Sequence, residues 1–166
     1  MTDKLNILIL CTGNSARSLI AEGLLNHLGE TWLNAYSAGS NPTGKPNPFA
    51  IEILQRNGID TSFATSKSWT EFAHSSSPEM DLIITVCANA AGEVCPVWPG
   101  HPSDAHWGVA DPAAASGSDC EKLEQFKICF EQMKERISVF INGLEAGEQP
   151  GKLAARIEQQ YPDKYL

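Results

Sequence analysis

The strongest constraint on the fold is a change of hydrophobic period near the N-terminus. Residues 6–11 form a short apolar run, which is typical of a buried strand. From Arg17 onward the apolar residues recur at helical spacing, and Gly29 follows the last of them. This pattern predicts an amphipathic helix closed by a glycine. A buried strand joined to such a helix by a short connection is the beginning of a βαβ unit.

The alternation of strand and helix patterns continues along the chain. Strands are predicted over residues 34–38 and 80–86, and helices over residues 49–56 and 123–144. Ser116 or Ser118 is suited to cap the long helix, and a helical turn is expected over residues 69–73. Residues 88–115, which are rich in proline, are expected to be largely loop. These elements predict an α/β fold with a parallel sheet and helices on both faces.

Length and cysteine content bound the organisation of the chain. With 166 residues it has room for one domain with a hydrophobic core, which we place at residues 1–146. Residues 147–166 are expected to be a polar C-terminal tail, in which residues 153–160 can form one or two helical turns. No apolar run approaches the roughly 20 residues of a membrane span, and the run over residues 5–10 is too short for a signal peptide. A cytoplasmic location is therefore expected, where five cysteines argue against a static disulfide framework.

The charge balance excludes one class of function. The chain has 12 Lys and Arg against 20 Asp and Glu, which gives a formal net charge of -8 without a long basic block. Such a chain is unsuited to gripping nucleic acid or an anionic membrane surface. An anion can bind only where backbone amides and a placed arginine create a local site.

The connection between the first strand and the first helix has the features of such an anion site. It begins at Cys11 and follows the pattern Cys-x5-Arg-Ser. Ligands of parallel sheets bind at the carboxyl ends of the strands, where the amides of the next helix point outward. Glycine and asparagine allow the backbone to curl, and the arginine offers a charged fork for two anion oxygens. The expected oxyanion-binding residues are Thr12, Gly13, Asn14, Ser15, Ala16, Arg17 and Ser18.

Cys11 is the candidate nucleophile of this loop. The surrounding amides, the helix N-terminus and Arg17 all favour a thiolate, so we expect its pKa to lie well below the free value of about 8.5. Ser18 can donate a hydrogen bond to the sulfur and stabilise it as a leaving group. The structural alternative, a core cysteine followed by a surface arginine, does not explain why both occur between a strand and a helix.

Residues 11–18 resemble the phosphate-binding loop of the low molecular weight protein tyrosine phosphatases. The run from Ser37 to Gly39 is similar to the strand that follows in that family, and Asp111 with Pro112 is similar to its general-acid motif. The resemblance extends over residues 6–144 and implies a four-stranded parallel sheet flanked by helices. It implies that Asp111 protonates the leaving group, whereas a turn residue before proline is the structural alternative. Asn14, Glu22 and Ser37 match positions that support the loop or hold a monovalent cation in some relatives, and hydrogen bonding behind the loop is expected of each.

The chain departs from the phosphatases after the Asp-Pro motif. The paired tyrosines typical of the family are absent, and residues 113–117 are small instead. Cys87 follows the strongest predicted strand and Cys95 lies eight residues later, which resembles the arsenate reductase branch of the same fold. That resemblance implies reduction of arsenate to arsenite, in which Cys11 attacks arsenic, Cys87 attacks Cys11 and Cys95 attacks Cys87.

The spacing of the two further cysteines constrains this relay. A continuous helix over residues 87–95 would separate them by about 12 Å along its axis. A disulfide requires Cα atoms within roughly 4.4–6.8 Å, so this segment is expected to loop or unwind during the reaction. The implied external reductant is thioredoxin, or glutaredoxin with glutathione, and no bound cofactor is expected.

Two other functions remain as alternatives to arsenate reduction. One is a phosphatase acting on phosphotyrosine or a small phosphoester, in which the extra cysteines protect Cys11 from overoxidation. The other is a non-catalytic oxyanion-binding or redox-sensing module, which does not need the acid Asp111. A metal site made of the cysteines and His101 or His106 is disfavoured, because the spacings differ from those of structural zinc sites. Of the last two cysteines, Cys129 is expected to pack in the long helix and Cys120 to be exposed.

Overall fold

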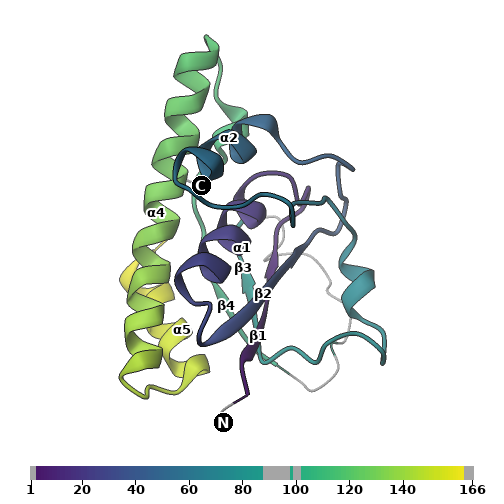
Figure 1. Ribbon diagram of the computed structural model, residues 1–166, viewed down its shortest axis with the longest axis vertical. Coiled ribbons are helices and arrows are strands. Elements are labelled where there is room, and N and C mark those ends of the chain that lie inside the picture. The colour runs from purple at the N-terminus through teal and green to yellow at the C-terminus, as the bar shows by residue number, and fades with distance from the viewer. Residues whose placement is uncertain (1–2, 88–97, 99–101, 163–166) are drawn as a thin grey trace.

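The computed structural model describes residues 3–87, 98 and 102–162. Its centre is a sheet of four parallel strands in the order β2-β1-β3-β4 (Figure 1). The strands are β1 (Leu5–Leu10), β2 (Leu33–Ala38), β3 (Leu82–Thr85) and β4 (Ser103–His106). The α/β fold with a four-stranded parallel sheet is therefore confirmed, as are the three strands predicted from apolar runs. The predicted site residue Cys95 lies outside the described residues.

Most of the described α-helices begin at a residue whose side chain caps the first turn. They are α1 (Arg17–Leu28), α2 (Pro48–Arg56), α4 (Asp119–Glu145) and α5 (Pro150–Gln160), with short 3₁₀ helices η1 (Trp69–Phe72) and η2 (Pro112–Ala114). Of the two candidate caps for α4, the structure uses Ser118, whose hydroxyl accepts from the amide of Glu121 at 3.2 Å. Within the described part of the chain, no helix is long and apolar enough to span a membrane.

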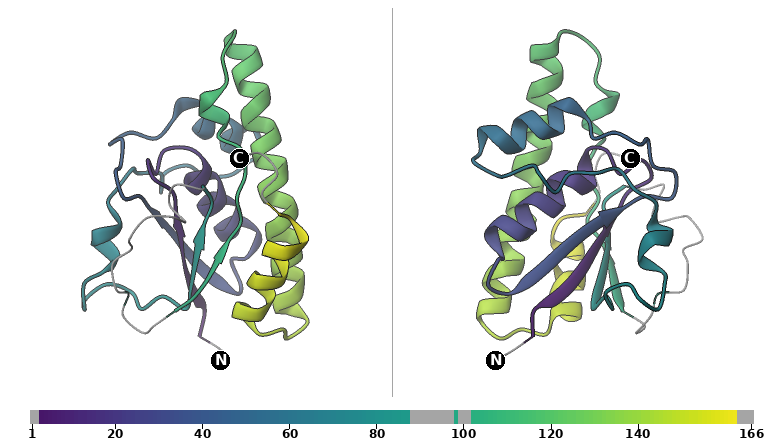
Figure 2. Two further views of the ribbon diagram at one scale, coloured as in Figure 1. Left: turned by 180° about the vertical axis from the view of Figure 1, so that it is seen from behind. Right: turned by 45° about the vertical axis from the view of Figure 1, so that its right-hand side comes forward.

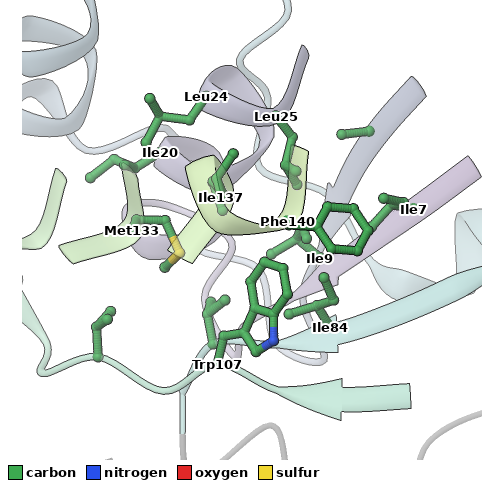
Figure 3. Close-up of a cluster of buried hydrophobic side chains, with 14 of the residues drawn as sticks. Ile7, Ile9, Ile20, Leu24, Leu25, Ile84, Trp107, Met133, Ile137 and Phe140 are labelled. Carbon is green, nitrogen blue, oxygen red and sulfur yellow. The ribbon is translucent and has the colours of Figure 1, made fainter. Parts of the chain in front are cut away.

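The alternation of β1 divides the core into two parts. Ile7 and Ile9 face the larger cluster, formed with α1, α2, α4 and α5, whereas Leu8 and Leu10 face a smaller cluster that includes Phe72. Figure 3 shows the larger cluster, with side chains of α1 and α4 packed over the strands. Figure 2 shows these α-helices on one side of the sheet and η1 on the other. Helices thus cover both faces, and among the described residues the helix on the second face is the 3₁₀ helix η1.

One strand occupies a segment that was expected to be loop. β4 (Ser103–His106) lies within residues 88–115, as does η2, so the loop prediction is wrong there. β4 pairs with β3 only and is an edge strand in which Ala105 alone is buried. Its polar sequence therefore carries no apolar alternation from which a strand could be predicted.

A packed helix occupies much of the segment expected to be a polar tail. α5 buries Leu153, Ala154 and Ile157 and lies against β4 and α4 (Figure 1). The helical turns expected over residues 153–160 are confirmed, and the helix is longer than that. Its apolar stripe is narrow and the remaining positions are polar, which is why composition suggested a tail.

The order of the strands determines where the site lies. The chain passes from β1 to β2 on one side of the sheet and then returns to β3 on the other side of β1. Ligands of open parallel sheets bind at such a reversal, beyond the carboxyl ends of the strands. Because Leu10 pairs in register with Thr85, Cys11 and Cys87 emerge side by side at this edge of the sheet.

Candidate active site

The loop after β1 is held from outside through its carbonyl oxygens. Those of Thr12, Gly13 and Ser15 accept hydrogen bonds of 2.8–3.0 Å from backbone amides of residues 41–47. In a trans peptide the N–H points opposite to the C=O, so the neighbouring amides face the inside of the loop. Asn14 adds a left-handed bend, with φ of 46°. The result is a concave set of N–H groups suited to an anion.

Gly39 is required by the close approach of β2 to this loop. A Cβ atom on Gly39 would lie 2.4 Å from the carbonyl oxygen of Thr12 and 2.7 Å from that of Cys11. Either distance is a severe overlap, so only glycine allows the chain after β2 to support the loop from behind. This explains the glycine in the run from Ser37 to Gly39.

The N-terminus of α1 opens toward the same loop. Ala16 is its N-cap residue and provides no side-chain hydrogen bond to the first turn, where serine, threonine or aspartate would ordinarily bond an amide. The amides of this turn and the helix dipole are therefore directed at the loop. Arg17 begins the helix, and its side chain is 15% exposed at the rim of the site.

Arg17 joins the loop to the segment that carries Asp111. Its Nη1 donates to the carbonyl oxygen of Val109 at 3.0 Å, and its Nη2 lies 3.7 Å from Oδ2 of Asp111. The other oxygen of Asp111 accepts from the amide of Ala113 at 3.0 Å and caps η2. Asp111 is thus the turn residue before a proline and also a carboxylate at the oxyanion loop, because its two oxygens serve different partners.

Seven of the predicted site residues line a cavity of about 260 Å³, and Cys87 is not among them. Its lining consists of Cys11, Thr12, Gly13, Ser15, Ala16, Arg17, Thr43, Asp111 and Ala113. Thr43 and Ala113 were not among the predicted site residues. Thr43 carries no pattern that distinguishes it within its Gly- and Pro-rich loop, whereas Ala113 belongs to the small residues that replace the tyrosines. Asn14 and Ser18 are buried and do not line the cavity.

A buried polar network supports the loop from below. The side-chain amide of Asn14 donates to the hydroxyls of Ser18 at 2.8 Å and Ser37 at 2.9 Å. Its oxygen accepts from the backbone amide of Lys67 at 2.9 Å. The hydroxyl of Ser37 then donates to the carboxylate of Glu22. The expectation that Asn14, Glu22 and Ser37 support the loop is confirmed, and the network fixes the left-handed bend at Asn14.

Glu22 places a titratable group beneath the oxyanion loop. Burial raises the pKa of its carboxyl to about 7, although the hydrogen bond from Ser37 and the positive charge of Lys67 both act to lower it. The pKa of Lys67 is lowered, mainly by burial, while Glu22 and Glu71 act to raise it. The charge under the loop therefore changes near neutral pH.

Cys11 and Cys87 form a coupled thiol pair. The hydrogen bond to Cys87 is the largest cause that raises the pKa of Cys11, followed by burial, while Arg17 and the amide of Gly13 act to lower it. The expected depression of the Cys11 pKa is therefore wrong for this arrangement. The backbone amide of Thr12 donates to the sulfur of Cys87 at 3.4 Å, so Cys11 keeps its proton beside a sulfur that already accepts a hydrogen bond.

The last two described cysteines are placed as expected. Cys129 is buried in α4, and burial raises its pKa to about 12. Cys120 is exposed near the start of the same helix. His101, like Cys95, lies outside the described residues. Among the residues that the structure does describe, no group of three or more histidine, cysteine and acidic side chains could hold a metal ion.

Comparison with known sequences identifies the family. The profile of the family described as low molecular weight phosphotyrosine protein phosphatase matches residues 6–150. The chain belongs to this family. An arsenate reductase of Bacillus licheniformis is 42% identical over 147 residues, which cover 87% of this chain and 99% of the relative. Family membership and this relative agree with the geometry of the loop, Arg17 and Asp111.

Solved structures of the same fold include members named as arsenate reductases. One, described as an arsenate reductase in the phosphate binding state, has a TM-score of 0.68 and 28% identity, and the match covers 83% of this chain and 97% of that one. A thioredoxin-dependent arsenate reductase of Corynebacterium glutamicum has a TM-score of 0.64 and 24% identity, covering 89% of this chain and 65% of that chain. At that identity the second likeness concerns the fold alone.

Proposed function

We propose that this protein reduces arsenate to arsenite by a cysteine thiol–disulfide relay. The observation that carries the proposal is the hydrogen bond between Cys11 and Cys87 beside the oxyanion loop. A phosphatase needs one thiolate, because water hydrolyses its phosphocysteine. Reduction of arsenic(V) to arsenic(III) takes two electrons, and two adjacent thiols supply them by forming one disulfide. The similarity to arsenate reductases supports the same activity.

The first step forms a bond between sulfur and arsenic. Arsenate lies against the loop amides, with Arg17 on its oxygens. Cys87 begins the step as the thiolate, and the proton of Cys11 passes to it along their hydrogen bond. The Cys11 thiolate attacks arsenic, and one oxygen leaves as water after taking a proton from Asp111. Arg17 and the amide of Gly13 both favour the Cys11 thiolate, which suits them to this step.

The second step reduces arsenic. The sulfur of Cys87 attacks the sulfur of Cys11, and the electron pair of the sulfur–arsenic bond stays with arsenic. Arsenite leaves with the proton from Cys87, and a disulfide joins Cys11 and Cys87. The amide of Thr12, at 3.4 Å from the Cys87 sulfur, stabilises negative charge on that sulfur as the proton departs.

The third step restores the nucleophile. We propose that Cys95 attacks Cys87, which frees Cys11 and leaves a disulfide between Cys87 and Cys95 for an external dithiol to reduce. Thioredoxin is the proposed donor, because a dithiol can reduce the disulfide between Cys87 and Cys95 by exchange. Glutaredoxin with glutathione is the alternative donor. A reducing compartment, the cytoplasm, suits a protein whose thiols must be regenerated.

Arsenate-dependent NADPH oxidation tests the proposal. Purified protein is assayed with thioredoxin and its reductase, and in parallel with glutathione, glutaredoxin and glutathione reductase. Turnover with thioredoxin that is lost in Cys11→Ser, Cys87→Ser and Cys95→Ser is the expected result, and Cys120→Ser is the matched control that keeps activity. Turnover with glutaredoxin alone that survives Cys95→Ser would remove Cys95 and thioredoxin from the mechanism.

A phosphatase remains the second candidate because of the family match and the set of Cys11, Arg17 and Asp111. The wall of the cavity argues against an aryl substrate, since the described lining contains Thr43 and Ala113 and nothing aromatic. Arsenate and phosphate are close in size and charge, so the loop can bind both. Hydrolysis of a phosphoester that requires Cys11 and Asp111, with no arsenate turnover from either donor, would make phosphatase the function.

A further inference from the structure

The segment that carries Asp111 is anchored to the helices behind the site. Trp107, directly after β4, is 1% exposed and packs edge-on against Phe140 of α4, with ring centroids 5.5 Å apart (Figure 3). Its Nε1 donates to the carbonyl oxygen of Ala154 in α5 at 3.0 Å. Trp107 therefore fixes the start of the segment against both α4 and α5, four residues before Asp111.

The next residue is held by a buried arginine. Arg136 of α4 is 7% exposed, and its Nη2 donates to the carbonyl oxygen of Gly108 at 3.4 Å while its Nη1 donates to Gln132 at 2.8 Å. The ring of Tyr161, just after α5, lies 5.0 Å from the guanidinium carbon. Burying a charged group is costly unless it is compensated, so these contacts fix the guanidinium in one place.

The two arginines act on successive carbonyl groups. Arg136 binds that of Gly108 from the side of α4, and Arg17 binds that of Val109 from the side of the oxyanion loop. The backbone that leads to Asp111 is thus held by hydrogen bonds from two sides, one from the core and one from the active site. Arg17 also faces Asp111. A substitution of Arg136 that moves Gly108 is therefore expected to shift the carboxylate of Asp111, three residues later.

Several contacts that hold this segment come from α5 and from Tyr161 after it, beyond the region that matches the family. The family match ends at residue 150, where α5 begins. α5 accepts the Trp107 bond at Ala154, and Glu158 accepts from the backbone amide of His106 at 2.5 Å. Tyr161 completes the set by covering Arg136.

We propose that Arg136, held by Tyr161, is a positioning residue that orients Asp111 for proton transfer, and that α5 is the brace for this segment. The inference rests on the proposed role of Asp111 as the general acid of arsenate reduction. A misplaced acid slows the chemical step, whereas arsenate binding depends on the loop amides and Arg17. Loss of the brace therefore lowers kcat and leaves the KM for arsenate nearly unchanged.

A double-mutant cycle separates positioning from a general structural role. Arsenate reduction is measured for the full chain with its donor in the wild type, Arg136→Met, Asp111→Asn and the double variant. We expect Asp111→Asn to lower kcat about 100-fold, within the range for general acids, and Arg136→Met to lower it about tenfold. In the Asp111→Asn background Arg136→Met should cost almost nothing further, because the group it positions is gone. Arg156→Met on the exposed side of α5 is the matched control and should leave kcat unchanged.

A milder pair of variants covers the case in which Arg136→Met does not fold. Tyr161→Leu removes the ring over the guanidinium, and Tyr161→Phe keeps it. We expect Tyr161→Leu to lower kcat about threefold to tenfold and Tyr161→Phe to restore it, with the helical circular dichroism of both matching the wild type.

Three outcomes decide the matter. Loss of kcat in Arg136→Met or Tyr161→Leu that disappears in the Asp111→Asn background supports the brace. The same loss in both backgrounds overturns it and leaves the proposed function intact. No loss in Asp111→Asn itself, with arsenate turnover retained, removes the general acid and the brace together.

Discussion

Thr12 donates its backbone amide to the sulfur of Cys87, 75 positions later in the chain, at a distance of 3.4 Å. The hydroxyl of Thr12 also lies 3.6 Å from that sulfur. An amide at the mouth of the oxyanion loop therefore bonds the second thiol rather than facing open space. The contact links the anion site to the redox pair, because the amide that bonds the Cys87 sulfur is adjacent to the amides that would bond an oxyanion in the loop.

The first prediction concerns the ionisation of Cys11. The hydrogen bond to Cys87 is the largest cause that raises the Cys11 pKa, and Arg17 and Gly13 act to lower it. In Cys87→Ala the raising contribution is lost, so the Cys11 pKa should fall. A fall of one pKa unit gives about tenfold more thiolate below the pKa. Alkylation of Cys11 by iodoacetamide at pH 7, followed by mass spectrometry, should become at least about tenfold faster.

Cys120→Ala serves as the control for that prediction, because Cys120 is exposed whereas Cys11 and Cys87 are both buried. It should leave the alkylation rate of Cys11 unchanged. An equal rate in Cys87→Ala and the wild type would show that Cys87 does not hold the Cys11 proton.

The second prediction tests the approach of β2 to the loop. Gly39→Ala would place its Cβ 2.4 Å from the carbonyl oxygen of Thr12, so the loop must shift. We expect the KM for arsenate to rise tenfold or more, and the free energy of unfolding to fall by about 2 kcal/mol, as for other overpacked sites. Urea unfolding and arsenate titration measure the two effects.

Gly58→Ala separates overlap from backbone strain. Gly58 has φ of 74° and no atom within 4 Å of an added Cβ. This variant should cost about 1 kcal/mol of stability and leave the KM for arsenate unchanged. A change in KM as large as that of Gly39→Ala would mean that glycine flexibility, not close approach, shapes the loop.

Much of this architecture could be predicted from local pattern. The apolar run at residues 6–11, the helix from Arg17 and the loop between them are short-range features, and each reappears at its expected place. β4 could not be predicted, because the strand is polar and is defined by pairing with β3. The packing of α5 was equally hidden, since three apolar residues among polar ones do not reveal what they contact.

The pKa of Cys11 could not be predicted from the sequence, because it depends on a neighbour that the pairing of the strands places beside it. The loop alone favours the thiolate through Arg17 and the amides, and both effects are present. Cys87 and, after it, burial raise the pKa and reverse the result. The position of Cys87 depends on β3 pairing beside β1 rather than on any motif. The sequence therefore indicates which residues form the site more readily than it indicates the net effect of these residues on the pKa of Cys11.

The third prediction concerns the fork of Arg17. One nitrogen bonds the carbonyl oxygen of Val109 and the other faces Asp111, which a lysine ammonium cannot do in the same geometry. Arg17→Lys keeps the charge and should still raise the KM for arsenate about tenfold or more. Arg56→Lys, on the exposed face of α2, is the control and should have no effect. An unchanged KM in Arg17→Lys would indicate that charge alone suffices.

The fourth prediction follows from Glu22. Its pKa is about 7 in the folded protein against 4.5 for a free glutamate, so the native state binds the proton more tightly than the unfolded state. Stability from this group is therefore complete below pH 4.5 and is lost as the pH rises toward and through 7. The full loss corresponds to about 3 kcal/mol. Glu22→Gln cannot ionise, so urea unfolding should show a flatter dependence of the free energy of unfolding across that window.

Glu52→Gln is the matched control for this last prediction, because Glu52 is exposed on α2. It should reproduce the pH dependence of the wild type. The same dependence in Glu22→Gln would mean that the buried carboxylate keeps its charge throughout, stabilised by Lys67 more strongly than burial opposes it. In that case the network under Asn14 would be an ion pair, and the oxyanion loop would keep one charge state beneath it at all pH values near neutrality.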